Sequence, residues 1–134
     1  MMTMRKAVAG ILIHEDKVLI GKKIKKEGHF VSGCWHIPGG HVFDNEDDIT
    51  ALLREFKEET NLDIEIIRKI TSIEIPKNEV IVHWYLCKTN SKDFVPGDDL
   101  SEIKLVDKKD VIEQCDKRAT ALWPKEVLEY LKKH

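Results

Sequence analysis

The 134-residue chain is poor in features that would indicate an oxidising compartment or a modular architecture. It has three widely spaced cysteines and no C-x-x-C pair: Cys34, Cys87 and Cys115. Isolated cysteines in odd number indicate neither a disulfide framework nor a zinc site, so we expect a reducing, cytoplasmic setting. Internal repeats, low-complexity segments and linkers are also missing. The length therefore predicts a single domain over residues 1–134.

The chain also lacks a dominant charge and a long apolar run. Its 22 basic and 24 acidic residues give a net charge of -2, which does not favour electrostatic binding of duplex nucleic acid. No apolar run reaches the length of a membrane span, so we expect no membrane partner. The apolar residues 7–13 follow Arg5 and Lys6, but charged residues come directly after them. We therefore expect a strand there and not a signal peptide.

The strongest positive feature is the acidic segment from Gly40 to Leu62, which follows a Pro-Gly-Gly turn. Its periodicity predicts a helix over residues 47–60, with Asp44 or Asn45 as the N-cap. Apolar residues recur at i, i+3, i+4 and i+7, the spacing of a core-facing stripe: Ile49, Leu52, Leu53 and Phe56. At about 100° per residue, three carboxylates share roughly 100° of arc beside that stripe: Glu55, Glu58 and Glu59.

Carboxylates on adjacent helical turns repel one another. A hard divalent cation removes that repulsion, and magnesium prefers oxygen ligands from carboxylates, water and phosphate. Arg54 precedes Glu58 by four residues, so it can pair with Glu58 and orient it, although it cannot ligate a metal. An acidic helix face is most often a solvated surface. The fixed spacing of this set nevertheless favours a metal site.

The segment resembles the box that defines the Nudix family, G-x5-E-x7-R-E-U-x-E-E-x-G-U, where U is a bulky aliphatic residue. Seven positions are in register: Gly40, Glu46, Arg54, Glu55, Glu58, Glu59 and Leu62. The preceding residues 35–40 match the family's W-x-x-P-G-G entry. Phe56 places an aromatic ring at the first U position, and Asn61 replaces the second glycine. Asparagine tolerates the left-handed conformation that ends a helix, so we expect Asn61 to substitute well. Outside the box, Phe43 and Asn45 depart from the residues that family members often carry there.

The resemblance implies an α/β fold, a Nudix-like α/β/α sandwich in which a mixed sheet lies between flanking helices. It also implies a hydrolase that depends on Mg²⁺, with Mn²⁺ as an alternative. The bond it implies is a diphosphate bond in a nucleoside diphosphate linked to another group.

The resemblance further implies the roles of individual residues. The expected metal ligands are the carbonyl of one glycine and three carboxylates: Gly39, Glu55, Glu58 and Glu59. The expected catalytic residues are Glu55, Arg54 and Glu102, with Glu55 or Glu102 as the base that accepts a proton from water. Glu102 is equally well explained as a surface glutamate, and Asp98 or Asp99 can take its place.

The remaining sequence predicts a sheet around the box helix. We expect a hairpin from residues 5–13 and 17–22, and strands over residues 35–37, 62–75, 80–87 and 103–106, with 62–75 forming one strand or two. A short helix is expected over residues 110–116, and Pro124 is expected at the first position of a last helix. The lysines at 22, 23, 25 and 26 are interpreted as a solvated loop more readily than as phosphate contacts.

The compact length resembles the MutT-type nucleoside triphosphate pyrophosphohydrolases, which release a monophosphate and pyrophosphate. The expected partner is thus a small-molecule nucleotide, and a homodimer is left open. Nucleotide sugars, ADP-ribose and dinucleoside polyphosphates are alternative substrates. A catalytically silent module that only binds a nucleotide, and a small metal- or protein-binding domain, are rival readings.

Overall fold

One mixed sheet organises the molecule, and the computed structural model describes residues 4–25 and 33–133. Its strands are β1 (Arg5–His14), β2 (Lys17–Lys23), β3 (Trp35–His36), β4 (Gly39–His41), β5 (Glu65–Ile75), β6 (Val80–Lys88) and β7 (Leu100–Asp107). The strand order is β3-β2-β1-β6-β5, with β4 also paired to β1 and β7 to β2. β1 and β6 run parallel, whereas β1 and β2 run antiparallel.

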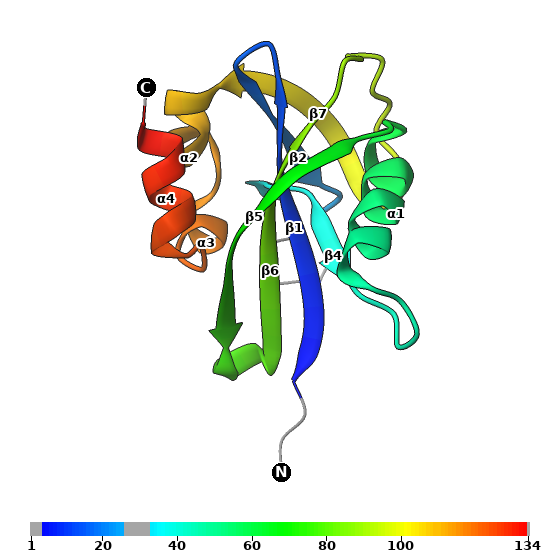
Figure 1. Ribbon diagram of the computed structural model, residues 1–134. Coiled ribbons are helices and arrows are strands. Elements are labelled where there is room, and N and C mark those ends of the chain that lie inside the picture. Colours follow the sequence, from blue (N-terminus) through cyan, green and yellow to red (C-terminus); the bar gives the residue numbers. More distant parts are fainter. Residues whose placement is uncertain (1–3, 26–32, 134) are drawn as a thin grey trace.

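Helices cover both faces of this sheet. They are α1 (Asp48–Thr60), α2 (Val111–Gln114), α3 (Lys117–Thr120) and α4 (Lys125–Lys132), with 3-10 turns η1 (Pro76–Asn78) and η2 (Lys108–Asp110). Figure 1 shows α1 on one side and α2, α3 and α4 on the other. The expected fold, a mixed sheet between flanking helices, is confirmed.

β1 lies at the centre of the sheet because its side chains serve both cores. Val8 and Leu12 pack in the cluster that contains α1 residues. Ala9 and Ile11 pack in the opposite cluster, which contains α4 residues. Since alternate side chains of a strand point to opposite faces, one apolar strand supports both layers. The turn to β2 has Glu15 and Asp16 at φ 50° and 66°, the left-handed pair of a two-residue hairpin.

One edge of β1 is shared by two strands, and this arrangement fixes the start of the box. β2 pairs with the C-terminal end of β1, at Ile13, and β4 pairs with its N-terminal half, where Ala9 lies opposite Gly39. A Cβ on Gly39 would collide with the Val8 carbonyl oxygen, so the close pairing requires glycine. The Pro-Gly-Gly turn expected from the sequence is therefore partly a short strand.

Helix α1 begins and ends close to the predicted positions. Its N-cap is Asp47 and not Asp44 or Asn45, because the Asp47 carboxylate accepts a hydrogen bond from Thr50 N at 2.7 Å. The C-terminal prediction is confirmed: Asn61 has φ 63° and its amide donates to the Lys57 carbonyl. Asparagine thus closes the helix in the conformation that glycine usually supplies.

The predicted core stripe of α1 is only half correct. Leu52 and Phe56 are fully buried, but Ile49 and Leu53 are 38% and 40% exposed. The helix is turned so that carboxylates point inward, because Glu55 and Glu59 are buried together with the two apolar side chains. Two of the predicted metal ligands on this helix, Glu55 and Glu59, therefore lie on its core face, whereas Glu58 is exposed.

Other boundaries differ modestly from expectation. β5 is one continuous strand, β7 starts earlier than predicted, and the four-residue α3 was not foreseen. Pro124 is the N-cap of α4 and not its first helical residue. Among the described residues, no helix combines the length and apolar character needed to cross a membrane.

Candidate active site

Three carboxylates meet beside α1. Glu55 and Glu58 come from the helix, and Asp98 comes from the loop between β6 and β7. One carboxylate oxygen from each lies within 4.8 Å of the others. Glu55 is buried, while Glu58 and Asp98 are more open. Solvent therefore reaches the group at Glu58 and Asp98, whereas Glu55 faces the protein interior.

The loop that carries Asp98 is attached to the end of α1. Val95 N donates to the Thr60 carbonyl at 2.9 Å, and Gly97 N donates to the Glu59 carbonyl at 3.0 Å. These carbonyls have no partner within the helix, so the loop satisfies them. A Cβ on Gly97 would collide with the Glu58 carbonyl oxygen. From the sequence, Asp98 is only an alternative to Glu102, because no sequence pattern indicates that this loop contacts the end of α1.

Gly40 and Glu55 explain why the box begins with glycine. A Cβ at position 40 would collide with the Glu55 carboxylate, so any side chain there displaces that group. Gly39 precedes it in β4, which packs against α1. The predicted carbonyl ligand thus belongs to a strand that adjoins the helix bearing the carboxylates.

Glu59 is the most deeply buried carboxyl group of the site. Its residue is 1% exposed, and its Oε1 atom has no hydrogen-bond partner among the described residues. Burial, followed by the nearby charges of Glu55 and Asp99, raises the pKa of Glu59 to about 9. Burial also raises the pKa of Glu55, although Arg54 opposes that effect. A buried carboxyl without a partner is costly, and a cation would relieve that cost.

Arg54 connects the carboxylates to one another. Its Nη1 donates to Glu55 Oε1 at 3.0 Å and lies 3.3 Å from Glu58 Oε2. Its Nη2 donates to the His41 carbonyl at 3.0 Å, which attaches the guanidinium to β4. The predicted pairing with Glu58 is present, but Glu55 is the closer of these two carboxylates.

Glu46 holds the other edge of Arg54. Arg54 Nε and Nη2 donate to the two Glu46 carboxylate oxygens at 2.8 and 2.9 Å. These hydrogen bonds, with one from Phe43 N, lower the pKa of Glu46 to about 2. The Phe43 ring lies over the guanidinium, 3.8 Å from Cζ to the ring centre. Glu46 therefore anchors the arginine, and Phe43, a departure from the family pattern, stacks on it.

Glu102 is not part of the carboxylate group. It lies on β7 opposite Lys22, with 3.5 Å between Lys22 Nζ and Glu102 Oε2. Its side chain is 60% exposed. Of the residues predicted to be functional, the structure brings together Arg54, Glu55 and Glu58, with Glu59 buried nearby, and it gives Asp98 the place considered for Glu102.

The four lysines predicted to lie in a loop differ in their surroundings, and the first two, Lys22 and Lys23, are the last residues of β2. Lys23 Nζ donates to Asp99 Oδ2 at 2.8 Å, and its side chain is only 21% exposed. Lys25 is exposed, and Lys26 lies outside the described residues. The interpretation as a solvated loop is therefore wrong for Lys22 and Lys23, which belong to a strand.

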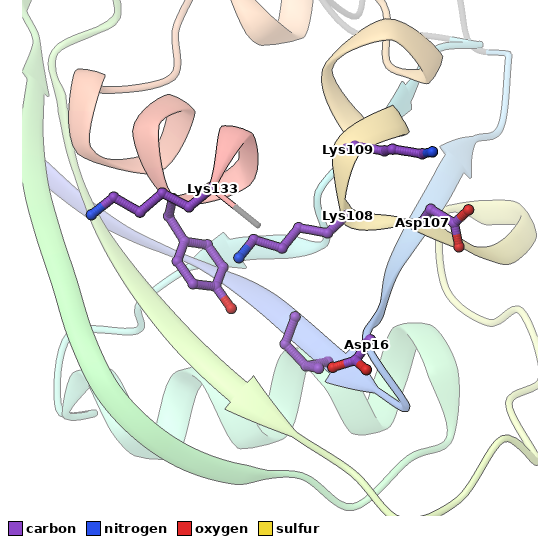
Figure 2. Close-up of a pocket in the computed structure, with 7 residues that line it drawn as sticks. Asp16, Asp107, Lys108, Lys109 and Lys133 are labelled. Carbon is purple, nitrogen blue, oxygen red and sulfur yellow. The ribbon is translucent and has the colours of Figure 1, made fainter.

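A hollow beside α4 is lined by none of the box residues. It has a volume of about 410 Å³ and is lined by Ile13, Asp16, Asp107, Lys108, Lys109, Tyr130 and Lys133. Lys108 Nζ lies 4.0 Å from the centre of the Tyr130 ring. In Figure 2 the Lys108 side chain extends into the middle of the hollow, whereas the Lys109 and Lys133 ammonium groups end at its two sides. No residue of the carboxylate group lines it.

The NUDIX domain matches residues 4–131 of the chain. The chain belongs to the Nudix family. A Nudix-family hydrolase from Clostridium perfringens has a solved structure with a TM-score of 0.72, covering 96% of both chains at 20% identity, and that likeness supports the fold.

Three curated relatives carry different activities in their names. An RNA pyrophosphohydrolase from Pelagibacter ubique is 34% identical over 86 residues, 60% of this chain and 52% of that protein. An ADP-ribose pyrophosphatase from Methanocaldococcus jannaschii is 31% identical over 109 residues, 75% of this chain and 60% of that protein. An 8-oxo-dGTP diphosphatase from Buchnera aphidicola is 34% identical over 79 residues, 59% of each protein. The Nudix chain thus spans between half and three fifths of these relatives.

Proposed function

We propose that this protein is a divalent-metal-dependent hydrolase of a diphosphate bond in a nucleoside diphosphate linked to another group. The observation that carries the proposal is the group formed by Glu55, Glu58 and Asp98, whose oxygens lie within 4.8 Å of one another beside the buried Glu59. Membership of the Nudix family and the names of the three relatives support the reaction class.

The residues present fit a divalent cation. Glu59 has a buried oxygen without a partner, and neighbouring carboxylates raise its pKa further, which is the condition that a cation relieves. We assign the cation to Glu55, Glu58, Glu59 and Asp98, with the Gly39 carbonyl as a further ligand. When bound, Mg²⁺ or Mn²⁺ supplies charge that neutralises the diphosphate and polarises the attacking water.

Two side chains are assigned roles other than cation binding alone: Arg54 orients the carboxylates and Glu55 acts as the base. Arg54 touches Glu55 and Glu58 and is itself held by Glu46, so it orients the carboxylates and does not contact the reacting phosphorus. Glu55 is assigned as the base that accepts a proton from water. It is buried and belongs to the carboxylate group. Glu102 is exposed and paired with Lys22, which makes it the weaker candidate.

The substrate we favour is a nucleoside triphosphate, which would be cut to a monophosphate and pyrophosphate. The similarity to an 8-oxo-dGTP diphosphatase supports this choice. The similarity to an ADP-ribose pyrophosphatase and an RNA pyrophosphohydrolase supports the alternatives of ADP-ribose or an RNA end. Nucleotide sugars and dinucleoside polyphosphates belong to the same reaction class and stay in the comparison.

A substrate panel tests the proposal. Nucleoside triphosphates, ADP-ribose, nucleotide sugars, dinucleoside polyphosphates and a 5′-triphosphate RNA would each be incubated with Mg²⁺ and with excess chelator, and the products separated by chromatography. We expect pyrophosphate from nucleoside triphosphates with Mg²⁺ and no turnover in chelator. Cleavage of another member alone would change the substrate assignment. Binding without turnover on every member would favour a silent nucleotide-binding module, and full turnover in chelator would end the metal assignment.

A further inference from the structure

The loop that carries Asp98 is also held from the side of β2. Ile24 N donates to the Asp99 carbonyl at 2.7 Å, and Lys23 Nζ donates to Asp99 Oδ2 at 2.8 Å. The hydrogen bonds of this loop to α1 join backbone atoms, which residues of almost any type supply. Phe94 adds an apolar contact with the cluster that contains α1 residues. The Lys23–Asp99 ion pair is different because it depends on two particular side chains.

Asp98 needs support from its neighbours. Its φ is 51°, a left-handed conformation that is sterically unfavourable for a residue other than glycine. The residue lies between Gly97, which is bonded to α1, and Asp99, which is bonded to β2. Loss of either attachment allows the backbone at Asp98 to relax toward commoner conformations. Its carboxylate would then leave Glu55 and Glu58.

The chain contains a second ion pair of the same chemistry for comparison. Lys22 pairs with Glu102 at 3.5 Å, and the two side chains are 38% and 60% exposed. Lys23 and Asp99 are closer, at 2.8 Å, and are 21% and 43% exposed. Exposed pairs at longer distance contribute little. Lys22 is therefore a matched control, adjacent in sequence, for the effect of removing a lysine charge.

We propose that Lys23 is a positioning residue that acts through Asp99 to hold Asp98 beside Glu55 and Glu58 for cation binding. This inference rests on the function proposed above, since it concerns the affinity of the same site. The hydrogen bond of Lys23 is to Asp99, which is not among the carboxylates that we assign to the cation.

The sign of one substitution separates positioning from simple electrostatics. Lys23 carries a positive charge near Glu59 and Asp99, so its charge alone disfavours a bound cation. If charge were its whole contribution, Lys23→Met would tighten cation binding. If Lys23 positions Asp98, the same variant weakens binding, because a ligand is lost from its place. Partners of metal ligands typically change affinity 10- to 100-fold when removed.

The experiment measures Mn²⁺ dissociation constants by isothermal titration calorimetry on metal-free protein, with thermal melts as the check on folding. We expect Lys23→Met and Asp99→Asn to bind Mn²⁺ roughly 10-fold more weakly than the wild type. The double variant should be no weaker than the weaker single variant, since both changes break one contact. Lys23→Arg should retain wild-type affinity, and Lys22→Met should bind as tightly as the wild type or slightly more tightly.

Several results would overturn the inference. Unchanged or tighter Mn²⁺ binding by folded Lys23→Met would do so, as would additive losses in the double variant. If Lys23→Met does not fold, Lys23→Gln takes its place with the same expectation. Asp98→Asn separates this inference from the proposed function. If Asp98→Asn binds normally, both the carboxylate assignment and the inference are wrong, whereas a loss in Asp98→Asn with none in the Lys23 variants overturns the inference alone.

Discussion

The two faces of the sheet bury different kinds of side chain under their helices. On the α4 side, Val127 and Leu131 pack with Trp84 and Trp123, whose rings meet edge to face at 5.9 Å. On the α1 side, Leu52 and Phe56 are joined by the buried carboxyl groups of Glu55 and Glu59. Both helices are amphipathic, but only α1 turns carboxyl groups toward the protein interior, since Glu126 and Glu129 of α4 are exposed.

The packing on the α4 side contributes to the stability of the fold, whereas the buried carboxyl groups on the α1 side belong to the candidate active site. Apolar packing on the α4 side lowers the free energy of the folded state in proportion to the area removed from water. Burial of Glu59 has the opposite effect, since its pKa of about 9 reflects the cost of ionising a buried carboxyl. The α1 face therefore carries a destabilising group within an apolar cluster, whereas the cluster on the α4 face has no buried carboxyl group among the described residues. Ionisable groups whose pKa is shifted by burial are typical of functional sites.

The largest expected effect comes from neutralising the α1 carboxylates. Glu58→Gln and Glu59→Gln should each lower turnover on the order of 100-fold or more, because several kcal/mol of transition-state stabilisation depends on the cation they hold. The fold should survive in both, since Glu58 is exposed and the Glu59 carboxyl is costly to bury. The measurement is kcat at saturating Mg²⁺, with a thermal melt of each variant. Near wild-type turnover in both variants would mean that the acidic stripe is only a surface.

The reverse effect is expected from the apolar face. Leu131 is 1% exposed, so Leu131→Ala should lower the free energy of unfolding by about 2–5 kcal/mol through lost burial and a cavity. Urea denaturation measures this change, and Mn²⁺ affinity of the folded variant should match the wild type. Leu53 on α1 is the control: it is 40% exposed, so Leu53→Ala should cost less than about 1 kcal/mol. Equal losses in the two variants would contradict the contrast between the faces.

The same contrast explains how far the sequence could be interpreted. The box spacing located α1 and its left-handed end at Asn61, because helical periodicity and capping are local properties. The spacing could not give the rotation of α1 about its axis. Apolar periodicity predicts that Leu53 faces the core. In the structure Glu59 is buried there and Leu53 is partly exposed. Packing against the rest of the protein therefore determines which of two adjacent stripes of α1 is buried, the one with Leu53 or the one with Glu59.

Asp98 was harder to predict for a different reason. Its loop reaches α1 through amide-to-carbonyl hydrogen bonds from Val95 and Gly97, and such bonds leave almost no mark on the sequence. Glu102 was favoured instead because a family pattern placed an acidic residue there, but β7 pairs it with Lys22. A family pattern is thus a weaker indication of this acidic residue than the path of the loop.

A pH-dependent effect follows from Glu59 in metal-free protein. Its pKa is raised from 4.5 to about 9 by folding, so the folded state retains a proton that the unfolded state releases in this range. The stabilising contribution is fully present below pH 4.5 and is lost as the pH rises toward 9. The free energy of unfolding should fall by at most about 1.4 kcal/mol per pH unit on this account. Denaturation curves with chelator at several pH values measure the slope. Glu59→Gln should flatten it, and an identical slope in wild type and variant would contradict the assignment to Glu59.

The smallest expected effect lies at the end of α1, where the chain departs from the family's glycine. Asn61 has φ 63°, and glycine adopts that conformation without a steric cost, so Asn61→Gly should change the free energy of unfolding by less than about 0.5 kcal/mol. Asn61→Ala is the matched control and should lose about 1 kcal/mol, because alanine is strained there. Urea denaturation and kcat with Mg²⁺ measure both variants. Since the Asn61 side chain is exposed and the cap contact uses its backbone amide, turnover should stay at the wild-type value in Asn61→Gly. Strong inactivation of that variant would mean that the asparagine side chain takes part in the site and does more than close the helix.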